Sequence, residues 1–380
     1  MKKWYETRVR PEDNSWIRVV LPLLLPIRCR YGIITVKIAR ACGSRRNVPE
    51  GGGEGGTSVK KCCFIIPYYG KLPDFLPVFA KSCERNPDFD WLLFTNDTTP
   101  PLPENVRVIH STLDEFKTLA EQKLGFPVRI DKAYKLCDFK PAYGFLFEEY
   151  LTEYAFWGHC DLDVILGKLG DFLTDDLLAQ YDKLFCLGHM TIYRNNPENN
   201  RIFMCEHNGI SLYRKVFSDP EICWFDEEYR DDNNINRIFL CQGRRVYRQD
   251  LSLNMFIGTR KFRRTEYVGR DHSDADDHGY ITEDYCPALY YWDQGRLLRI
   301  RNKEGKLEQQ SFLYMHLQYR KMRYYPGVLS AERFRIVPNR LLAARSLPSS
   351  PIAVSLMPKT EFIGYRIVQA LKRIFRKIIK

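Results

Sequence analysis

Two aspartates, Asp161 and Asp163, stand one residue apart at the end of an apolar and aromatic run. The run begins at Tyr154 as Tyr-Ala-Phe-Trp, which is typical of a buried strand, and apolar residues resume directly after the second aspartate. An ionised carboxylate is costly to bury unless it is paired or binds a metal, so the pair needs a chemical reason. Carboxylate oxygens suit hard cations such as Mg²⁺ or Mn²⁺. We expect the pair to hold such a cation and, through it, the diphosphate of a sugar nucleotide.

The elements around this pair predict an α/β fold. Short apolar runs that end in turn or polar residues predict strands at 62–66, 90–95, 106–109 and 183–187. Helical periodicity predicts helices over 75–86, 113–124 (with Ser111 or Thr112 as N-cap), 133–150 and 235–241. A strand at 245–249, a hairpin over 290–301 and a strand over 312–317 add a small antiparallel part. Alternating strands and helices favour a mostly parallel central sheet with helices on both faces.

Ligands of open α/β sheets bind beyond the carboxyl ends of the strands. Three polar or turn segments fall at such ends: 67–70, Asn96 with Asp97, and 161–163. We therefore expect these segments to meet at one rim of the sheet. The helix predicted over 133–150 precedes the aspartate strand, with Tyr134, Lys135 and Asp138 on one side and apolar residues on another.

Charge is concentrated at the two ends of the chain. The total is +11, and residues 1–57 (11 basic, 5 acidic) and 359–380 (7 basic, 1 acidic) each carry +6, which leaves 58–358 near neutral. This distribution argues against a nucleic-acid groove through the body and favours ends that meet an anionic surface.

Cysteine usage and hydropathy indicate a protein of the cytoplasm. None of the 12 cysteines forms a CxxC pair and several lie in apolar runs, as expected of reduced core cysteines. The apolar run 19–27 is too short to span a bilayer, and no small-residue cleavage site follows it.

Three regions are predicted. Residues 1–57 form a basic arm with a Gly-rich linker, 58–330 a catalytic domain, and 331–380 a C-terminal extension. Residues 361–380 alternate isoleucine and leucine with lysine and arginine, which predicts a basic amphipathic helix. We expect this helix to bind the anionic inner face of the plasma membrane; the alternative is a helix packed on its own domain.

From Trp157 to Asp163 the chain resembles the DxD glycosyltransferases of the GT-A fold, such as the glycogenin-like and clostridial-toxin-like groups. It is most similar to a bacterial family of unknown function found with capsule and lipopolysaccharide genes. The similarity extends over about 60–325 and includes companion motifs at 65–70, 134–141, 188–195 and 314–316.

The resemblance implies a metal-dependent transferase with a GT-A-like fold. It assigns Asp163 to the metal, Asp161 to the nucleotide-sugar and the metal site, and His316 to the third metal ligand. Imidazole suits Mn²⁺ better than Mg²⁺. The alternative for His316 is a hydrogen-bonded core histidine. The donor is expected to be a UDP- or GDP-sugar, and the acceptor a surface polysaccharide or a lipid-linked glycan.

The remaining site residues are assigned by chemistry and by position in the related enzymes. His189, Asp226 and Glu227 are expected to be catalytic, and the acidic pair suggests a retaining hexosyltransferase, although the acid–Gln pairing of those enzymes is absent. The residues expected to bind substrate are Pro67, Tyr68, Tyr69, Asp97, Lys135, Asp138, Lys140, Asp161, Arg194 and Asn195. Ordinary surface or solvated positions are the alternative for the tyrosines and lysines.

Two other functions fit parts of the sequence. A metal-dependent phosphohydrolase could use the aspartates, but Val164 and Ile165 follow where a DxDxT pattern needs threonine. A non-catalytic membrane-surface protein with a degenerate transferase fold would keep the basic ends. The charged segment 271–278 could bind metal, but its lack of apolar anchors is typical of an exposed loop.

Overall fold

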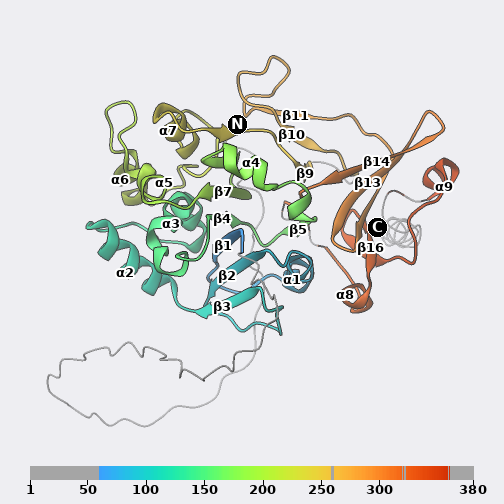
Figure 1. The fold of residues 1–380 in the computed structure, drawn as a ribbon, viewed down its shortest axis with the longest axis horizontal. Helices are drawn as coiled ribbons and strands as arrows, with labels where there is room; N and C mark the ends of the chain where they lie inside the picture. Colours follow the sequence, from blue (N-terminus) through green and yellow to red (C-terminus); the bar gives the residue numbers. More distant parts are fainter. Residues whose placement is uncertain (1–59, 258–260, 319, 321, 358, 360–380) are drawn as a thin grey trace, which may run out of the picture. The chain divides into compact units, whose positions relative to one another are not determined.

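Seven strands form the central sheet, in the order β3-β2-β1-β4-β7-β6-β8. The computed structural model describes residues 60–257, 261–318, 320, 322–357 and 359 (Figure 1). The strands are β1 (Cys62–Pro67), β2 (Phe89–Thr95), β3 (Val106–His110), β4 (Phe156–Cys160), β6 (Lys183–Leu187), β7 (Met190–Arg194) and β8 (Val246–Tyr247). Strand β7 is antiparallel to both neighbours, and the other adjacent pairs are parallel. The predicted mostly parallel central sheet is confirmed.

Both faces of this sheet are buried. Ile65 of β1 packs in one apolar cluster with helix α2 (Leu113–Leu124), and its neighbour Phe64 packs in another with helix α1 (Leu76–Glu84). Successive side chains of a strand point to opposite faces, so a strand covered on both sides must be apolar throughout. This explains the continuous apolar runs in the sequence and places the two helices on opposite faces (Figure 1).

Helix α2 shows how local sequence sets an element's bounds. The Thr112 hydroxyl accepts a hydrogen bond from the backbone N–H of Glu115, whose carboxylate accepts one from the backbone N–H of Thr112. This reciprocal capping box satisfies donors that the first turn leaves unpaired. At the other end Gly125 adopts a left-handed φ of 77°, which glycine tolerates and which terminates the helix. Of the two predicted N-caps, Thr112 is the one used.

The predicted helix over 133–150 is instead three shorter pieces. They are the 3₁₀ helix η1 (Ala133–Ala142), helix α3 (Tyr143–Leu146) and the 3₁₀ helix η2 (Glu148–Tyr150). Pro141 lies inside η1 and has no N–H to donate, so a regular α-helix cannot continue through it. The 3₁₀ geometry aligns residues three apart, and Lys135 and Asp138 therefore share a face. Tyr134 does not share it, because it is 63% exposed whereas both others are buried.

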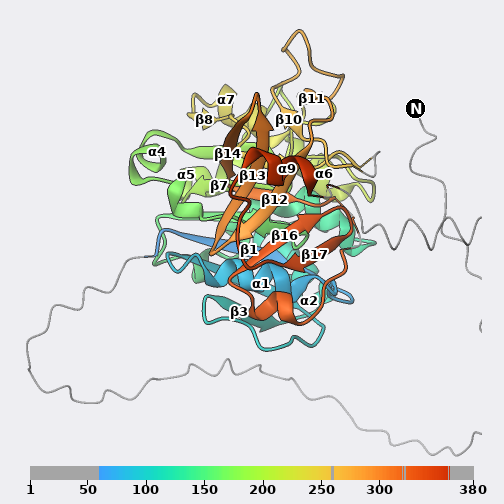
Figure 2. The same cartoon turned by 90° about the vertical axis from the view of Figure 1, so that its right-hand side faces the viewer.

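A second sheet is antiparallel, with the order β14-β13-β12-β16-β17 (Figure 2). Its strands are β12 (Ala288–Asp293), β13 (Arg296–Lys303), β14 (Lys306–Phe312), β16 (Arg333–Val337) and β17 (Arg340–Ala343). The predicted hairpin over 290–301 is the β12–β13 pair. Strand β16 pairs with β12, so the extension expected from residue 331 shares this sheet with the strands before it.

A three-stranded sheet, β5-β15-β9, joins distant parts of the chain. Strand β15 (Tyr314–His316) runs antiparallel to β5 (Val164–Leu166) and parallel to β9 (Ser252–Asn254). Since β5 directly follows the aspartate segment, this pairing brings residues near 316 to the end of β4. A two-stranded sheet, β10 (Thr265–Tyr267) with β11 (Tyr280–Thr282), completes the strands in the described residues.

The remaining short helices cover the sheets and loops. They are η3 (Leu169–Asp171), α4 (Asp175–Gln180), α5 (Pro197–Arg201), η4 (Ile202–Met204), α6 (Leu212–Ser218), α7 (Ile235–Cys241), α8 (Gly327–Ser330) and α9 (Pro351–Leu356). All described residues belong to one compact unit, Gly56–Lys380. The predicted arm 1–57 and the predicted helix 361–380 lie outside the described residues. None of the described helices is long and apolar enough to cross a membrane.

Candidate active site

A cavity of about 1480 Å³ lies at the carboxyl ends of the parallel strands. Its wall includes 67–69, directly after β1, and 161–163, directly after β4. Adjacent parallel strands end at the same edge of a sheet, and β1 pairs with β4, so both segments border one space. Two of the three segments expected at this rim therefore meet there, among them Pro67, Tyr68 and Tyr69.

The third segment supports the cavity from outside. Asn96 and Asp97 follow β2 and do not line the cavity. The Asn96 side-chain oxygen accepts a hydrogen bond from the backbone N–H of Gly70 at 2.8 Å, and Asp97 accepts one from Leu72 at 2.8 Å. Both side chains fix the loop after β1. Hydrogen bonds from the backbone N–H groups of Leu72 and Thr98 hold the pKa of Asp97 below its usual range.

Asp161, Asp163 and His316 form a cluster with the chemistry of a metal site. One potential ligand atom from each lies within 4.8 Å of the others, and all three side chains border the cavity. Pairing of β15 with β5 sets His316 opposite Val164, one residue after Asp163. Carboxylate oxygens bind both Mg²⁺ and Mn²⁺, and an imidazole nitrogen suits Mn²⁺ better. The donor set of this cluster therefore fits Mn²⁺.

The orientation of the His316 ring is set by a neighbouring strand. Its Nδ1 lies 3.0 Å from the side-chain oxygen of Asn254 on β9, and its Nε2 lies 3.5 Å from a carboxylate oxygen of Asp163. Burial acts to lower the pKa of His316, but the carboxylates of Asp163, Asp161 and Glu227 together outweigh it and the net pKa is raised. A second hydrogen-bonding partner of this kind directs the other ring nitrogen of a histidine toward a metal.

Lys140 joins the aspartate pair to a second acidic group. Its ammonium nitrogen lies 3.0 Å from Asp161, 3.3 Å from Asp226 and 2.7 Å from the carbonyl oxygen of Gly188. Burial acts to lower the pKa of Lys140, but the two carboxylates raise it well above its ordinary value. A permanent cation thus stands between the candidate metal site and the loop that carries Asp226 and Glu227, called the acidic loop below.

Asp226 and Glu227 lie in the cavity wall against Gly188. The backbone N–H of Gly188 donates to Glu227 at 3.2 Å, and a Cβ at position 188 would stand 2.6 Å from an Asp226 oxygen. Any side chain at Gly188 would therefore displace the acidic pair. Burial raises the pKa of Asp226 to about 8 and also raises that of Glu227. A carboxyl group with a pKa in this range can exchange a proton near neutral pH.

His189 also borders the cavity and is packed between two residues of β15. Its Nδ1 lies 2.7 Å from the Tyr314 hydroxyl, and its ring stacks on that of His316 at 4.3 Å between centroids. Burial lowers the pKa of His189 well below its usual value, so the ring is neutral. Its position fits a polar contact to a ligand in the cavity.

Four other predicted substrate residues do not line the cavity. Arg194 donates to the carbonyl oxygens of residues 178, 179 and 181, at the end of helix α4, and Asn195 donates to those of residues 151 and 154. Lys135 and Asp138 form a buried ion pair at 2.8 Å. These contacts account for all four side chains within the protein, and we assign no ligand contact to them.

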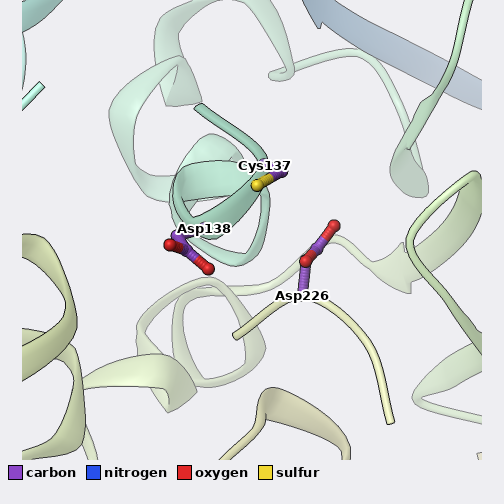
Figure 3. A group of neighbouring side chains, drawn as sticks. All are labelled: Cys137, Asp138 and Asp226. Carbon is purple, nitrogen blue, oxygen red and sulfur yellow. The ribbon is translucent and has the colours of Figure 1, made fainter. Parts of the chain in front are cut away.

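A second group of possible ligand atoms comprises Cys137, Asp138 and Asp226 (Figure 3). The first two project from η1, and Asp226 projects from the facing loop. Asp138 already accepts hydrogen bonds from Lys135 and from the backbone N–H groups of Cys223 and Phe225. Its oxygens are thus committed to holding the loop, and the contacts favour a structural role for this group over a metal site. Residues 271–278 belong to neither cluster.

Sequence reasoning missed several residues at the site. Asn254 carried no signal, because only the pairing of β9 with β15 brings it to His316. Trp224 lines the cavity, and its only sequence signal is that it stands two residues before Asp226. Cys137 and Tyr134 line the cavity too, although Tyr134 had been expected beside Lys135.

Comparison with solved structures found glycosyltransferases at low similarity. A structure of the galactosyltransferase LgtC in complex with donor and acceptor sugar analogs shares 14% identity, covering 51% of this chain and 75% of that one, with a TM-score of 0.29. An active-site mutant of LgtC gives nearly the same values. The glycosyltransferase GlyE of Streptococcus pneumoniae TIGR4 shares 13% identity over 43% of this chain and 45% of its own, with a TM-score of 0.24.

A search of curated proteins found no match. A family model matches residues 64–345, which contain both strand ends of the cavity, the candidate metal cluster and the acidic loop. That match spans most of the chain, and the protein therefore belongs to DUF6625, a family of unknown function.

Proposed function

We propose that the protein is a metal-dependent glycosyltransferase of the GT-A type that uses a nucleotide-diphosphate sugar. The observation that carries the proposal is the Asp161–Asp163–His316 cluster at the carboxyl edge of the sheet, facing a cavity of about 1480 Å³. Single small-molecule sites usually occupy roughly 300–1,000 Å³, so this cavity has room for a donor and part of an acceptor.

Under this proposal, one group of residues holds the cation and another binds the base. Asp163, His316 and Asp161 hold the cation, and Tyr68 and Tyr69 offer ring faces for the base at the end of β1. When bound, Mn²⁺ or Mg²⁺ supplies positive charge opposite the diphosphate leaving group.

The third role belongs to Asp226 and Glu227 of the acidic loop, which act on the reacting sugar. The raised pKa of Asp226 and its position across Lys140 from Asp161 support proton exchange beside the bond that breaks. We propose that Asp226 and Glu227 approach the reacting carbon in a retaining hexosyl transfer. His189 contributes a neutral polar contact from the same wall.

A nucleotide-sugar screen tests the proposal. The full chain is incubated with UDP- and GDP-sugars, with Mn²⁺ or with a chelator, and binding and slow donor hydrolysis are measured. We expect one base to bind in a Mn²⁺-dependent way and its sugar to be released slowly. Release of phosphate from simple phosphate esters, without nucleotide selectivity, would instead indicate a phosphohydrolase.

We further propose that the enzyme acts at the cytoplasmic face of the plasma membrane on a glycan or lipid-linked acceptor of a bacterial surface polysaccharide such as capsule or lipopolysaccharide. The support is the basic, amphipathic pattern of residues 361–380. Deleting 359–380 should abolish binding to vesicles containing anionic lipid while nucleotide binding persists. Unchanged vesicle binding would contradict the anchor.

A further inference from the structure

The segment before the acidic pair presents alternate side chains to the cavity. Ile222, Trp224 and Asp226 line the cavity wall. Between them, the backbone N–H groups of Cys223 and Phe225 point the other way and donate to the two oxygens of Asp138, each at 2.9 Å. Asp138 thus holds the backbone on both sides of Trp224.

Trp224 is held in an unfavourable backbone conformation. Its φ is 55°, in the left-handed region that bulky side chains rarely adopt. Such strain persists only where the surroundings impose it, and it concentrates at ligand sites. Here both flanking N–H groups are bound by one carboxylate, Asp138, which is 0% exposed.

The Asp138 carboxylate that binds this segment is itself paired with a buried cation. Lys135, 1% exposed, donates to Asp138 at 2.8 Å and to the carbonyl oxygen of Glu221 at 2.5 Å. Burying two charges costs more than burying apolar groups of the same size, so this pair is weak as a source of stability. Its geometric effect is to fix both ends of the turn that carries Trp224.

The indole ring is a partly exposed aromatic surface in the cavity wall, on the same loop as the carboxyl groups of Asp226 and Glu227. The guanidinium of Arg230 lies over the ring at 4.0 Å, and the ring of Tyr229 stacks beside it at 5.8 Å between centroids. Trp224 shares the cavity wall with the exposed side chains of Tyr134 and Ile257. An aromatic ring presents an electron-rich face, which attracts the weakly positive C–H groups on one side of a pyranose. The surrounding carboxylates and histidines supply partners for hydroxyl groups.

We infer that Trp224 is the stacking surface for a pyranose ring of the acceptor. This inference rests on the proposed transferase function. The charged groups form a series from the metal cluster through Lys140 to Asp226, and Trp224 is two residues from the last of these. The base is expected at Tyr68 and Tyr69, after β1, so Trp224 stands on the side of the reacting sugar.

Ligand-observed NMR on the full chain tests the inference. The probes are methyl β-D-galactopyranoside, methyl β-D-glucopyranoside and methyl α-D-mannopyranoside, each added in the presence of diamagnetic Mg²⁺ and UDP or GDP. We expect at least one glycoside to receive saturation from the protein. Binding should be roughly tenfold weaker in Trp224→Ala and only partly reduced in Trp224→Phe, which keeps an aromatic face.

Two variants separate binding from folding. Trp224→Gly should melt at a higher temperature than Trp224→Ala, because a φ of 55° strains alanine but not glycine, yet both should lose the glycoside. Tyr325→Ala removes an aromatic side chain that is 70% exposed and outside the cavity lining, and it should leave glycoside binding unchanged.

Three results would overturn the inference: no glycoside binds the wild type, Trp224→Ala binds it equally well, or Trp224→Ala loses nucleotide affinity instead. The last would assign the ring to the base. If glycoside binding depends on Trp224 but no nucleotide binds with Mn²⁺, the saccharide site stands and the transferase proposal fails.

Discussion

Two lysines of the same 3₁₀ helix, Lys135 and Lys140, make opposite uses of their charge. Lys135 is sealed with Asp138 beneath the acidic loop, where both oxygens of the carboxylate are also bound by backbone N–H groups. Lys140 borders the cavity and links Asp161 to Asp226. The first group fixes backbone, and the second sets the electrostatics of the space that a ligand would enter.

Two residues of the same type on the same helix can therefore have different roles, and the contacts of each side chain decide which role it has. A buried ion pair whose oxygens already bind a cation and two backbone N–H groups is committed to the protein itself. A cation between two carboxylates at a cavity wall can exchange partners when a charged ligand arrives. Substitutions at four positions test the roles assigned to these side chains.

The largest effect is expected from Lys135→Met. It leaves Asp138 buried without its cation, which should cost about 3–5 kcal/mol of unfolding free energy. Urea denaturation of the full chain measures this. Lys140→Met is the matched control, and it should cost less because its carboxylate partners border the cavity. Equal losses would remove the distinction between the two groups.

The next effect is expected on metal binding. Asp163→Asn replaces a charged candidate ligand with a neutral one, and Mn²⁺-dependent nucleotide affinity should fall on the order of 100-fold. Calorimetric titration with Mn²⁺ and the nucleotide measures it. Full retention of metal-dependent binding would place the site elsewhere in the protein.

A smaller effect for each pH unit is expected in the pH dependence of stability. Burial raises the pKa of Asp226 to about 8 from its ordinary value of 3.8, so its contribution is complete at acid pH, where the carboxyl is neutral in both states. As pH rises from about 4 to 8 the unfolded chain ionises first, and this contribution falls by on the order of 1 kcal/mol per pH unit.

Asp226→Asn removes that contribution. The difference in unfolding free energy between wild type and variant should therefore decrease from about pH 4 to pH 8 and level off above it. Denaturation curves across this range measure the difference. A difference that is constant with pH would show that Asp226 is ionised in the folded protein throughout.

The smallest effect is expected from Asp97→Ala. Its carboxylate supports the loop after β1 from outside the cavity, so Mn²⁺-dependent nucleotide affinity should fall only slightly, through the position of that loop. Competition binding with the nucleotide checks this. A marked loss of affinity would restore the sequence-based interpretation that Asp97 contacts the base or ribose.

The sequence predicts what depends on local pattern. Apolar runs locate the parallel strands because both faces of the sheet are buried, and the Thr112–Glu115 box locates the start of α2. The rim that gathers Tyr68 and Asp161 follows from the direction of parallel strands. His316 was placed beside the aspartates by resemblance, and the pairing of β15 with β5 brings it there.

What the sequence does not predict depends on burial and on long-range pairing. Lys135 and Lys140 look equivalent in the sequence, and only packing against the loop at 221–225 separates them. The helix predicted over 133–150 ignores the helix-breaking effect of Pro141, and the structure has a 3₁₀ helix there instead. Trp224 gives no sign in the sequence of its left-handed backbone conformation.

The pairing of β15 with β5 has a consequence for the order of folding. The two sides of the candidate metal cluster, Asp163 and His316, lie on segments far apart in the chain, and neither sits near its partner until β15 has docked. Non-local contacts of this kind form late because loop closure must precede them. During synthesis, the three-residue cluster can exist only after residue 316 has left the ribosome. The proposed metal site therefore needs the chain through residue 316, and a nascent or truncated product that ends before it would lack His316 even with its parallel sheet formed.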